Sequence, residues 1–369
     1  MKDIMKEIIL FLDYSVFPVS NDIILENIDL AIRNGCKIIF LDFGQYFPWS
    51  IDNIIKSDFS YSDKLVDRIN SVCKQNEIIL VPVLSVLIDS DYILNNNKYS
   101  LLKEDGYKNQ GLNISSCGVS KLIEELIEDI FSLFTKSEYL FFELPPITCK
   151  DKEWVGNIDP FIERLTLFIR NQNKKLIFGD NMNLKNINPE SDINRIVEYY
   201  NKPSGKIEVY KGKSLSIFFQ IYKIKIKNLE YSLYKLDKCC IFPSVFDSMM
   251  FSVNGNISTN NKYGIDFEML DDFLSSLENT WSIIRESSEF ISILDRTPNI
   301  KYRIQFYRII EEFKQEFVLL KKHSKLIKNV LEERFQTGFF TLWVNARIDP
   351  VYLHLINLNL KARHIREGI

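Results

Sequence analysis

The sequence predicts an α/β fold, a TIM-type (β/α) barrel with a C-terminal helical extension. Strand-like and helix-like segments alternate through the first two-thirds of the chain, as in βαβ units. The strand-like runs are almost continuously apolar, which is typical of parallel sheets buried on both faces. From about residue 285 the pattern changes to long helical periodicity without strands. We therefore expect residues 1–284 to form the barrel and residues 285–369 to form the helical extension.

The segments follow one another at a regular pitch, and each has a local signature. Short apolar runs predict strands at Ile8–Asp13, Lys37–Phe43, Ile78–Leu84, Tyr139–Glu143, Lys175–Asp180, Leu215–Tyr222 and Lys238–Phe246. Helical periodicity predicts the helices Asn21–Asn34, Ser62–Gln75, Ser120–Phe134, Asp159–Asn171 and Ile193–Tyr200. The polar stretch 88–117 is long enough to be a functional loop. No clear eighth strand follows, so the barrel is expected to be open or irregular there.

An open doubly wound sheet would give the same alternation of strands and helices. Its usual diagnostic is a glycine-rich phosphate-binding turn after the first strand, and this chain has none there. The barrel is therefore the preferred prediction.

The C-terminal part carries apolar residues at helical spacing. Tyr302–Phe335 reads as one long helix, and Val351–Ile365 reads as another that begins after Pro350. Such helices either stabilise the barrel or associate with a partner, so oligomerisation through them is one hypothesis.

Composition narrows the range of partners. The net charge is −3 with both signs interspersed, which argues against a nucleic-acid surface. No apolar run has the length of a membrane span, and the N-terminus shows no signal peptide. We therefore expect a cytoplasmic chain that binds neither nucleic acid nor membrane.

Acid–base chemistry in this chain has to come from carboxylates. The 3 histidines all lie in the last fifty residues, and the 6 cysteines show no metal-ligand spacing, so we expect neither a metal nor a cofactor. Glu143 ends the apolar run "YLFFE", and Asp13, Asp42 and Asp180 end or nearly end other strands. Ligands of parallel α/β folds bind at the carboxyl ends of the strands.

Glu143 is the candidate general acid, and the three aspartates are candidate binding groups. Desolvation by Phe141 and Phe142 would raise the pKa of Glu143, which suits an acid. The alternative is a purely structural glutamate, either solvated or salt-bridged at the strand end or buried with a hydrogen-bond partner.

Two tryptophans follow predicted strands. Trp49, in "YFPWS", follows the second strand, and Trp154, in "KEWVG", follows the fourth. Both are candidates for stacking on the apolar face of a sugar. The alternative is that each covers the edge of the core.

The order of these segments resembles the barrel of family 20 glycoside hydrolases, the β-N-acetylhexosaminidase type. The resemblance rests on "LFLDYSVFPVSNDIILENIDLAIRNGCKIIFLDFGQYFPW", "NEIILVPVLSVL", "LFFEL" and "KKLIFGDNMN", and the final "LWVNARIDP" resembles the helical extension of a bacterial subgroup. It implies a substrate-assisted reaction in which Glu143 protonates the glycosidic oxygen while the acetamido group of the sugar attacks. Asp180 matches the fifth-strand aspartate of the family.

Several family positions differ in this chain. Phe142 replaces the aspartate that orients the acetamido group, and Val16 replaces a sugar-binding arginine in the first-strand motif that keeps Asp13 and Ser15. Gly44-Gln45 stands where the family has an acidic pair, and Asp89 where it has a histidine. Phenylalanine cannot accept a hydrogen bond and valine cannot make bidentate contacts.

Two hypotheses follow. The first is a divergent glycosidase acting on N-acetylhexosamine-type or related glycosides. The second is a catalytically inactive relative that binds a carbohydrate, a glycoconjugate or a protein.

Overall fold

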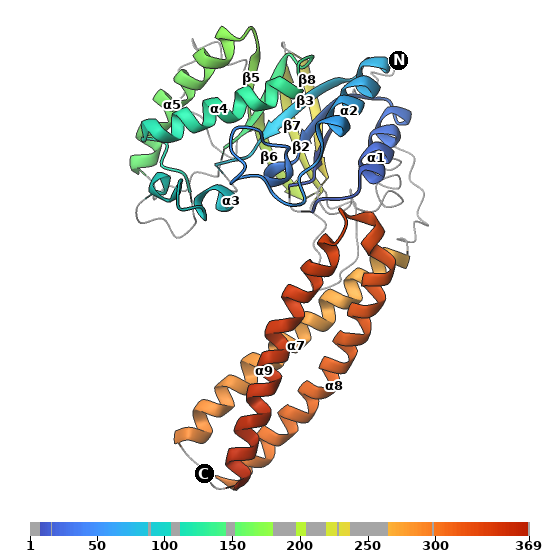
Figure 1. Cartoon of the computed structure of the whole chain (residues 1–369), viewed down its shortest axis with the longest axis vertical. Helices are drawn as coiled ribbons and strands as arrows, with labels where there is room; N and C mark the ends of the chain where they lie inside the picture. The colour runs from blue at the N-terminus through green and yellow to red at the C-terminus, as the bar shows by residue number, and fades with distance from the viewer. Residues whose placement is uncertain are drawn as a thin grey trace. The chain divides into compact units, whose positions relative to one another are not determined.

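The computed structural model describes residues 8–15, 17–87, 90–104, 111–144, 152–179, 197–203, 219–226, 229–236, 265–296 and 299–367. These residues divide into two compact units. One is a mixed α/β unit with a largely parallel sheet, and the other is a C-terminal helical unit (Figure 1). The coarse fold class expected from the sequence is therefore confirmed.

The sheet has the strand order β5-β4-β3-β2-β1-β8-β7-β6. Its first five strands pair in parallel in chain order: β1 (Ile8–Asp13), β2 (Cys36–Asp42), β3 (Ile79–Leu84), β4 (Tyr139–Glu143) and β5 (Lys175–Gly179). The next strands in the order are β8 (Leu229–Leu236), β7 (Phe219–Ile226) and β6 (Val197–Pro203). β8 is parallel to β1, but β7 is antiparallel to both of its neighbours.

This second half of the sheet corrects the sequence prediction. The predicted helix Ile193–Tyr200 is wrong, because its end lies in β6. The predicted strand Leu215–Tyr222 overlaps β7 only in part, β8 was not predicted, and Lys238–Phe246 lies outside the described residues. Antiparallel neighbours need no crossover helix, so β6, β7 and β8 do not follow the βαβ alternation. The two ends of the order, β5 and β6, approach within 8 Å between Cα atoms.

Helices flank the parallel strands (Figure 1). They are α1 (Asn21–Arg33), α2 (Asp63–Gln75), α4 (Cys117–Leu133) and α5 (Lys152–Asn171). Ser62 caps α2 by accepting a hydrogen bond from the Leu65 amide, and Ser116 caps α4 through Gly118. Shorter turns lie in the loops: η1 (Gly44–Tyr46), α3 (Asp91–Leu94) and η2 (Ser100–Leu102). The last two lie in the stretch predicted as a functional loop.

An aromatic layer on one face of the sheet shows to which face each strand residue points. The rings of Phe11, Phe40 and Phe141 lie 5.1 to 6.2 Å apart between centroids, and all three are buried. They come from β1, β2 and β4. Phe142 points to the other face, where its ring lies 6.0 Å from Phe161 of α5.

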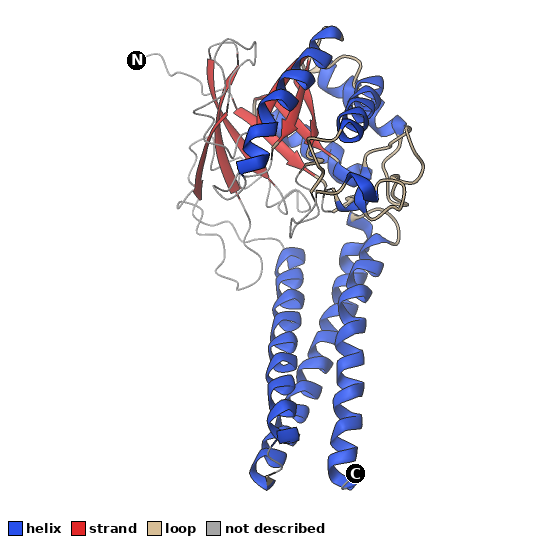
Figure 2. Cartoon of the chain, turned by 90° about the vertical axis from the view of Figure 1, so that its left-hand side faces the viewer, coloured by secondary structure: helices blue, strands red, loops and turns tan. Residues whose placement is uncertain are grey.

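The helical unit is built from three long helices that run side by side (Figure 2). They are α7 (Ile265–Arg296), α8 (Ile300–Leu331) and α9 (Phe339–Glu367), with η4 (Glu332–Arg334) between the last two. Residue 284, the predicted domain boundary, lies inside α7. Pro350 lies inside α9, so that helix begins before the predicted start. Within the described part of the chain, none of the helices combines the length and hydropathy of a membrane span.

Candidate functional site

Acidic side chains gather at the carboxyl edge of the parallel strands. Asp13 and Asp42 are register partners at the ends of β1 and β2, and Glu143 ends β4. Each stands two residues after a member of the aromatic layer. Because side chains two apart in a strand share a face, the three carboxylates lie on the same face as that layer, one step nearer the edge.

β3 contributes a serine to this edge. The pairing of Leu84 with Phe142 makes Ser85 and Glu143 the next residues along their strands. Ser85 donates a hydrogen bond of 2.8 Å from Oγ to Oδ2 of Asp42, and both side chains are buried. The sequence interpretation missed Ser85, although it follows a predicted strand just as the aspartates do.

Asp42 is held from two sides. It is 1% exposed, and its Oδ1 accepts a 2.8 Å hydrogen bond from the Gly44 amide in addition to the Ser85 contact at Oδ2. Hydrogen bonds of this kind orient a buried carboxylate and offset its desolvation. Asp42 therefore has a fixed orientation.

Asp13 and Glu143 differ in exposure. Asp13 is half-buried, and its Oδ1 accepts hydrogen bonds from the Ser15 amide at 3.0 Å and the Ser15 hydroxyl at 2.6 Å. Glu143 is only 6% exposed. Phe141 belongs to the aromatic layer beneath Glu143, but Phe142 faces α5 and not the carboxylates. The sequence predicted that Phe141 and Phe142 both desolvate Glu143. For Phe142 this prediction is wrong, because its ring lies on the other face of the sheet.

The surroundings of Gly44 admit no side chain. Its φ is +49°, and a Cβ built there would lie 2.5 Å from Cβ of Ser15. The loop after β1 thus fills the space that a carboxylate would need. A side chain at this position would therefore require the loop that carries Ser15 to move.

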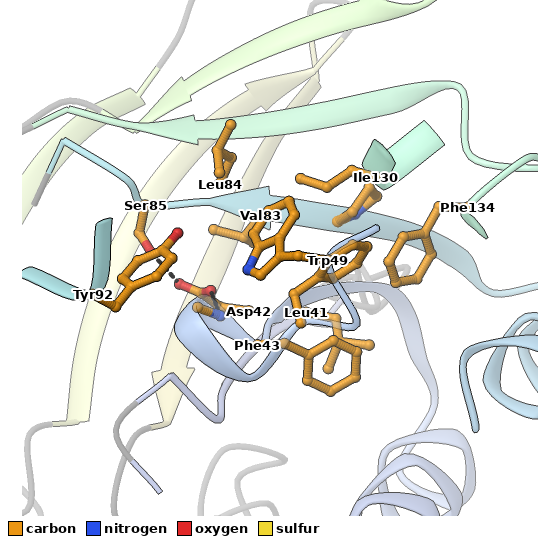
Figure 3. Close-up of a pocket in the computed structure, with 13 residues that line it drawn as sticks. Leu41, Asp42, Phe43, Trp49, Val83, Leu84, Ser85, Tyr92, Ile130 and Phe134 are labelled. Carbon is orange, nitrogen blue, oxygen red and sulfur yellow. Dashed lines mark hydrogen bonds between the residues drawn. The ribbon is translucent and has the colours of Figure 1, made fainter. Parts of the chain in front are cut away.

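A pocket lies beside this edge, between the ends of β2 and β3 and helix α4 (Figure 3). Its polar lining includes Asp42, Ser85, Trp49 and Tyr92, and its apolar walls include Phe134. The space inside holds at most about one water molecule. Glu143 does not line it. This pocket is therefore smaller than a sugar ring and separate from the candidate acid.

The two tryptophans are placed differently by the structure. Trp49 is 2% exposed and packs against Phe47, with ring centroids 4.4 Å apart. Stacking on a sugar would require this loop to move. Trp154 lies in the first part of α5, and its side chain is outside the described residues, as is Asp180.

Within the described ranges, no three His, Cys, Asp or Glu side chains come close enough to hold a metal ion. Cys36 and Cys73 are buried there, and desolvation raises the pKa of each thiol to about 12. Both are therefore protonated and unreactive at neutral pH.

Comparison with known proteins gives similarity only at the level of solved structures. No family model and no curated protein matches the chain. Dispersin B is similar at 17% identity and a TM-score of 0.42, over 50% of this chain and 62% of that one. The chitobiase of Flavobacterium johnsoniae is similar at 16% identity and a TM-score of 0.40, over 50% of this chain and 32% of the chitobiase. The β-N-acetylhexosaminidase of Bacteroides fragilis is similar at 15% identity and a TM-score of 0.38, over 47% of this chain and 40% of that enzyme. The aligned region spans less than two-thirds of each of these proteins, and similarity of this extent carries no information about activity.

Proposed function

We propose that this chain is a divergent glycoside hydrolase of the family 20 type, built on a barrel-like sheet, with Glu143 as the general acid. The observation that carries the proposal is the shared face of Asp13, Asp42 and Glu143 at the carboxyl edge of β1, β2 and β4, three parallel strands of one sheet. Glycosidases use paired carboxyl groups at such an edge. The substrate class, N-acetylhexosaminides or related glycosides, comes from the sequence resemblance.

We infer a different task for each carboxylate from its burial and its hydrogen bonds. Glu143 is buried, and burial of a carboxyl group suits proton donation. Asp13 is half-buried and nearer to solvent, so it is the candidate to contact a sugar or a water. Asp42 is held by Ser85 and Gly44, which suits orientation of a bound hydroxyl.

Two features support the second hypothesis, a non-catalytic binding module. Phe142 supplies no acceptor to the carboxylate face, and Gly44 cannot be replaced by an acid without moving Ser15. In such a module the same edge would bind a carbohydrate or a protein without turnover.

The experiment is an assay of chromogenic N-acetylglucosaminides and N-acetylgalactosaminides with wild type and Glu143→Gln. We expect Glu143→Gln to lower kcat/KM by roughly 10²- to 10⁴-fold, the range for loss of a general acid. The loss should shrink with a dinitrophenyl leaving group, because a good leaving group needs little protonation. Glu138→Gln is the matched control: this residue directly precedes β4, is exposed and pairs with Lys175, so its loss should leave turnover unchanged.

Two results would contradict the hydrolase proposal. One is equal turnover by wild type and Glu143→Gln. The other is no turnover of any glycoside combined with a sugar that raises the melting temperature, which supports the binding module.

A further inference from the structure

The pocket beside Asp42 contains a buried hydrogen-bond donor without an acceptor. Trp49 is 2% exposed, and its indole Nε1 finds no hydrogen-bond partner among the described residues. In Figure 3 this nitrogen faces the oxygen atoms of Asp42, Ser85 and Tyr92, which line the same pocket. Buried donors of this kind are normally satisfied, so an acceptor is expected in the pocket.

The lining decides which chemical group fits. An indole N–H only donates, so the group must accept a hydrogen bond from it. The Asp42 carboxylate only accepts, so the same group must also donate. An ammonium ion cannot accept and an anion is repelled by Asp42, whereas a neutral hydroxyl does both.

The size of the pocket limits the group further. The space holds about one water-sized oxygen, and the rest of the wall is formed by apolar side chains such as Val83, Leu84 and Phe134. A whole sugar ring does not enter. A single hydroxyl group has the size of the space.

We propose that this pocket is a hydroxyl-recognition subsite, in which one oxygen bridges Nε1 of Trp49 and the carboxylate of Asp42. In the free chain the oxygen belongs to a bound water, and a carbohydrate hydroxyl displaces that water when the ligand binds. The carbohydrate part rests on the proposed function, while the hydroxyl part rests on the pocket alone.

The test uses the indole N–H signals of the full chain labelled with ¹⁵N-tryptophan. The chain has only 4 tryptophans, so their signals should be separable, and Trp49→Phe identifies the one from Trp49. In the free chain the Trp49 proton should show cross-relaxation with a bound water. Titration with glycerol, a polyol that is not a sugar, and with N-acetylglucosamine should shift this signal to saturation. The signals of Trp281 and Trp343 in the helical unit are internal references.

The acceptor is tested by Asp42→Asn, with Asp58→Asn as the matched control. Asp58 lies in the same connection after β2 but is exposed and does not line the pocket. We expect Asp42→Asn to raise the probe concentration that half-saturates the Trp49 shift about tenfold or more, since a hydrogen bond to a charged group is lost. Ser85→Ala removes the hydroxyl beside Asp42 and should also weaken binding of the probe at Trp49. Asp58→Asn should have no effect.

The outcomes separate this proposal from the hydrolase. A Trp49 signal that shows no water contact and ignores both probes overturns the subsite, even if a glycoside is hydrolysed. Unchanged affinity in both folded Asp42→Asn and folded Ser85→Ala overturns it too. A response of the Trp49 signal without turnover of any glycoside supports the subsite and contradicts the enzyme. A response to glycerol alone keeps the hydroxyl subsite and removes carbohydrate as its ligand.

Discussion

At residue 44 the backbone determines which side chains the candidate site can contain. Gly44 has a left-handed φ of +49°, and an added Cβ would meet Ser15 at 2.5 Å. We expect Gly44→Ala to lower the free energy of unfolding by about 2–4 kcal/mol, because backbone strain and overpacking add. Urea unfolding measures it.

Gly35 provides the matched control for this prediction. Its φ is +77°, but nothing lies within 4 Å of an added Cβ. Gly35→Ala should therefore cost only the backbone strain, about 1 kcal/mol. Equal losses at both positions would show that the Ser15 loop moves aside freely.

The sequence revealed some residue-level features of the edge but not others. Asp13, Asp42 and Glu143 were found because each ends an apolar run. The face to which Phe142 points could not be predicted. β4 is buried on both faces, so its sequence shows no alternation of apolar and polar residues. The reason for Gly44 was also hidden, since it depends on contact with Ser15 in another loop.

At the scale of elements, the loop after β3 is tied to the loop after β2. Asp52 accepts hydrogen bonds from Lys98, from the Ile54 amide at 3.0 Å and from the Tyr99 hydroxyl at 2.9 Å. The hydrogen bond from Lys98, followed by the other two, lowers the pKa of Asp52 from 3.8 to about 2. Folding thus favours the ionised carboxylate, and the stabilisation is complete above the unfolded pKa.

The pH dependence of stability follows from this direction. The stabilisation from Asp52 should be lost as the pH falls from 3.8 to about 2. We expect the melting-temperature difference between wild type and Asp52→Asn to be largest above that window and to vanish below it. The effect is small because Lys98 is largely exposed. A difference that persists at the acid end would show that Asp52 acts through packing instead.

Element prediction succeeded where the signal was local. The predicted bounds of β1 to β5 agree with the structure within one residue, because a short apolar run identifies a buried strand. The end of the predicted helix Ile193–Tyr200 instead lies in β6, whose conformation depends on antiparallel pairing with a strand further along the chain, β7. That pairing leaves no local pattern, whereas the alternation of apolar and polar residues that opens β8, "LEYSL", is a local strand signal that the sequence prediction did not use.

At the scale of the whole molecule, each unit has its own core. The aromatic layer fills the α/β unit, and Phe313, fully buried beside Phe317, belongs to the core of the helical unit. Units with separate cores unfold separately when few contacts join them. Phe313→Ala should therefore destabilise the helical unit by about 3–5 kcal/mol.

The indole signals distinguish the two units in a thermal melt. Trp281 and Trp343 report on the helical unit, and Trp49 reports on the α/β unit. In Phe313→Ala the first two should lose their native shifts at a lower temperature while Trp49 keeps its own. Phe40→Ala, which removes a ring from the aromatic layer, should reverse this order. If either variant lowers the transition of all three tryptophans equally, the chain unfolds as one cooperative body, and the two cores depend on each other.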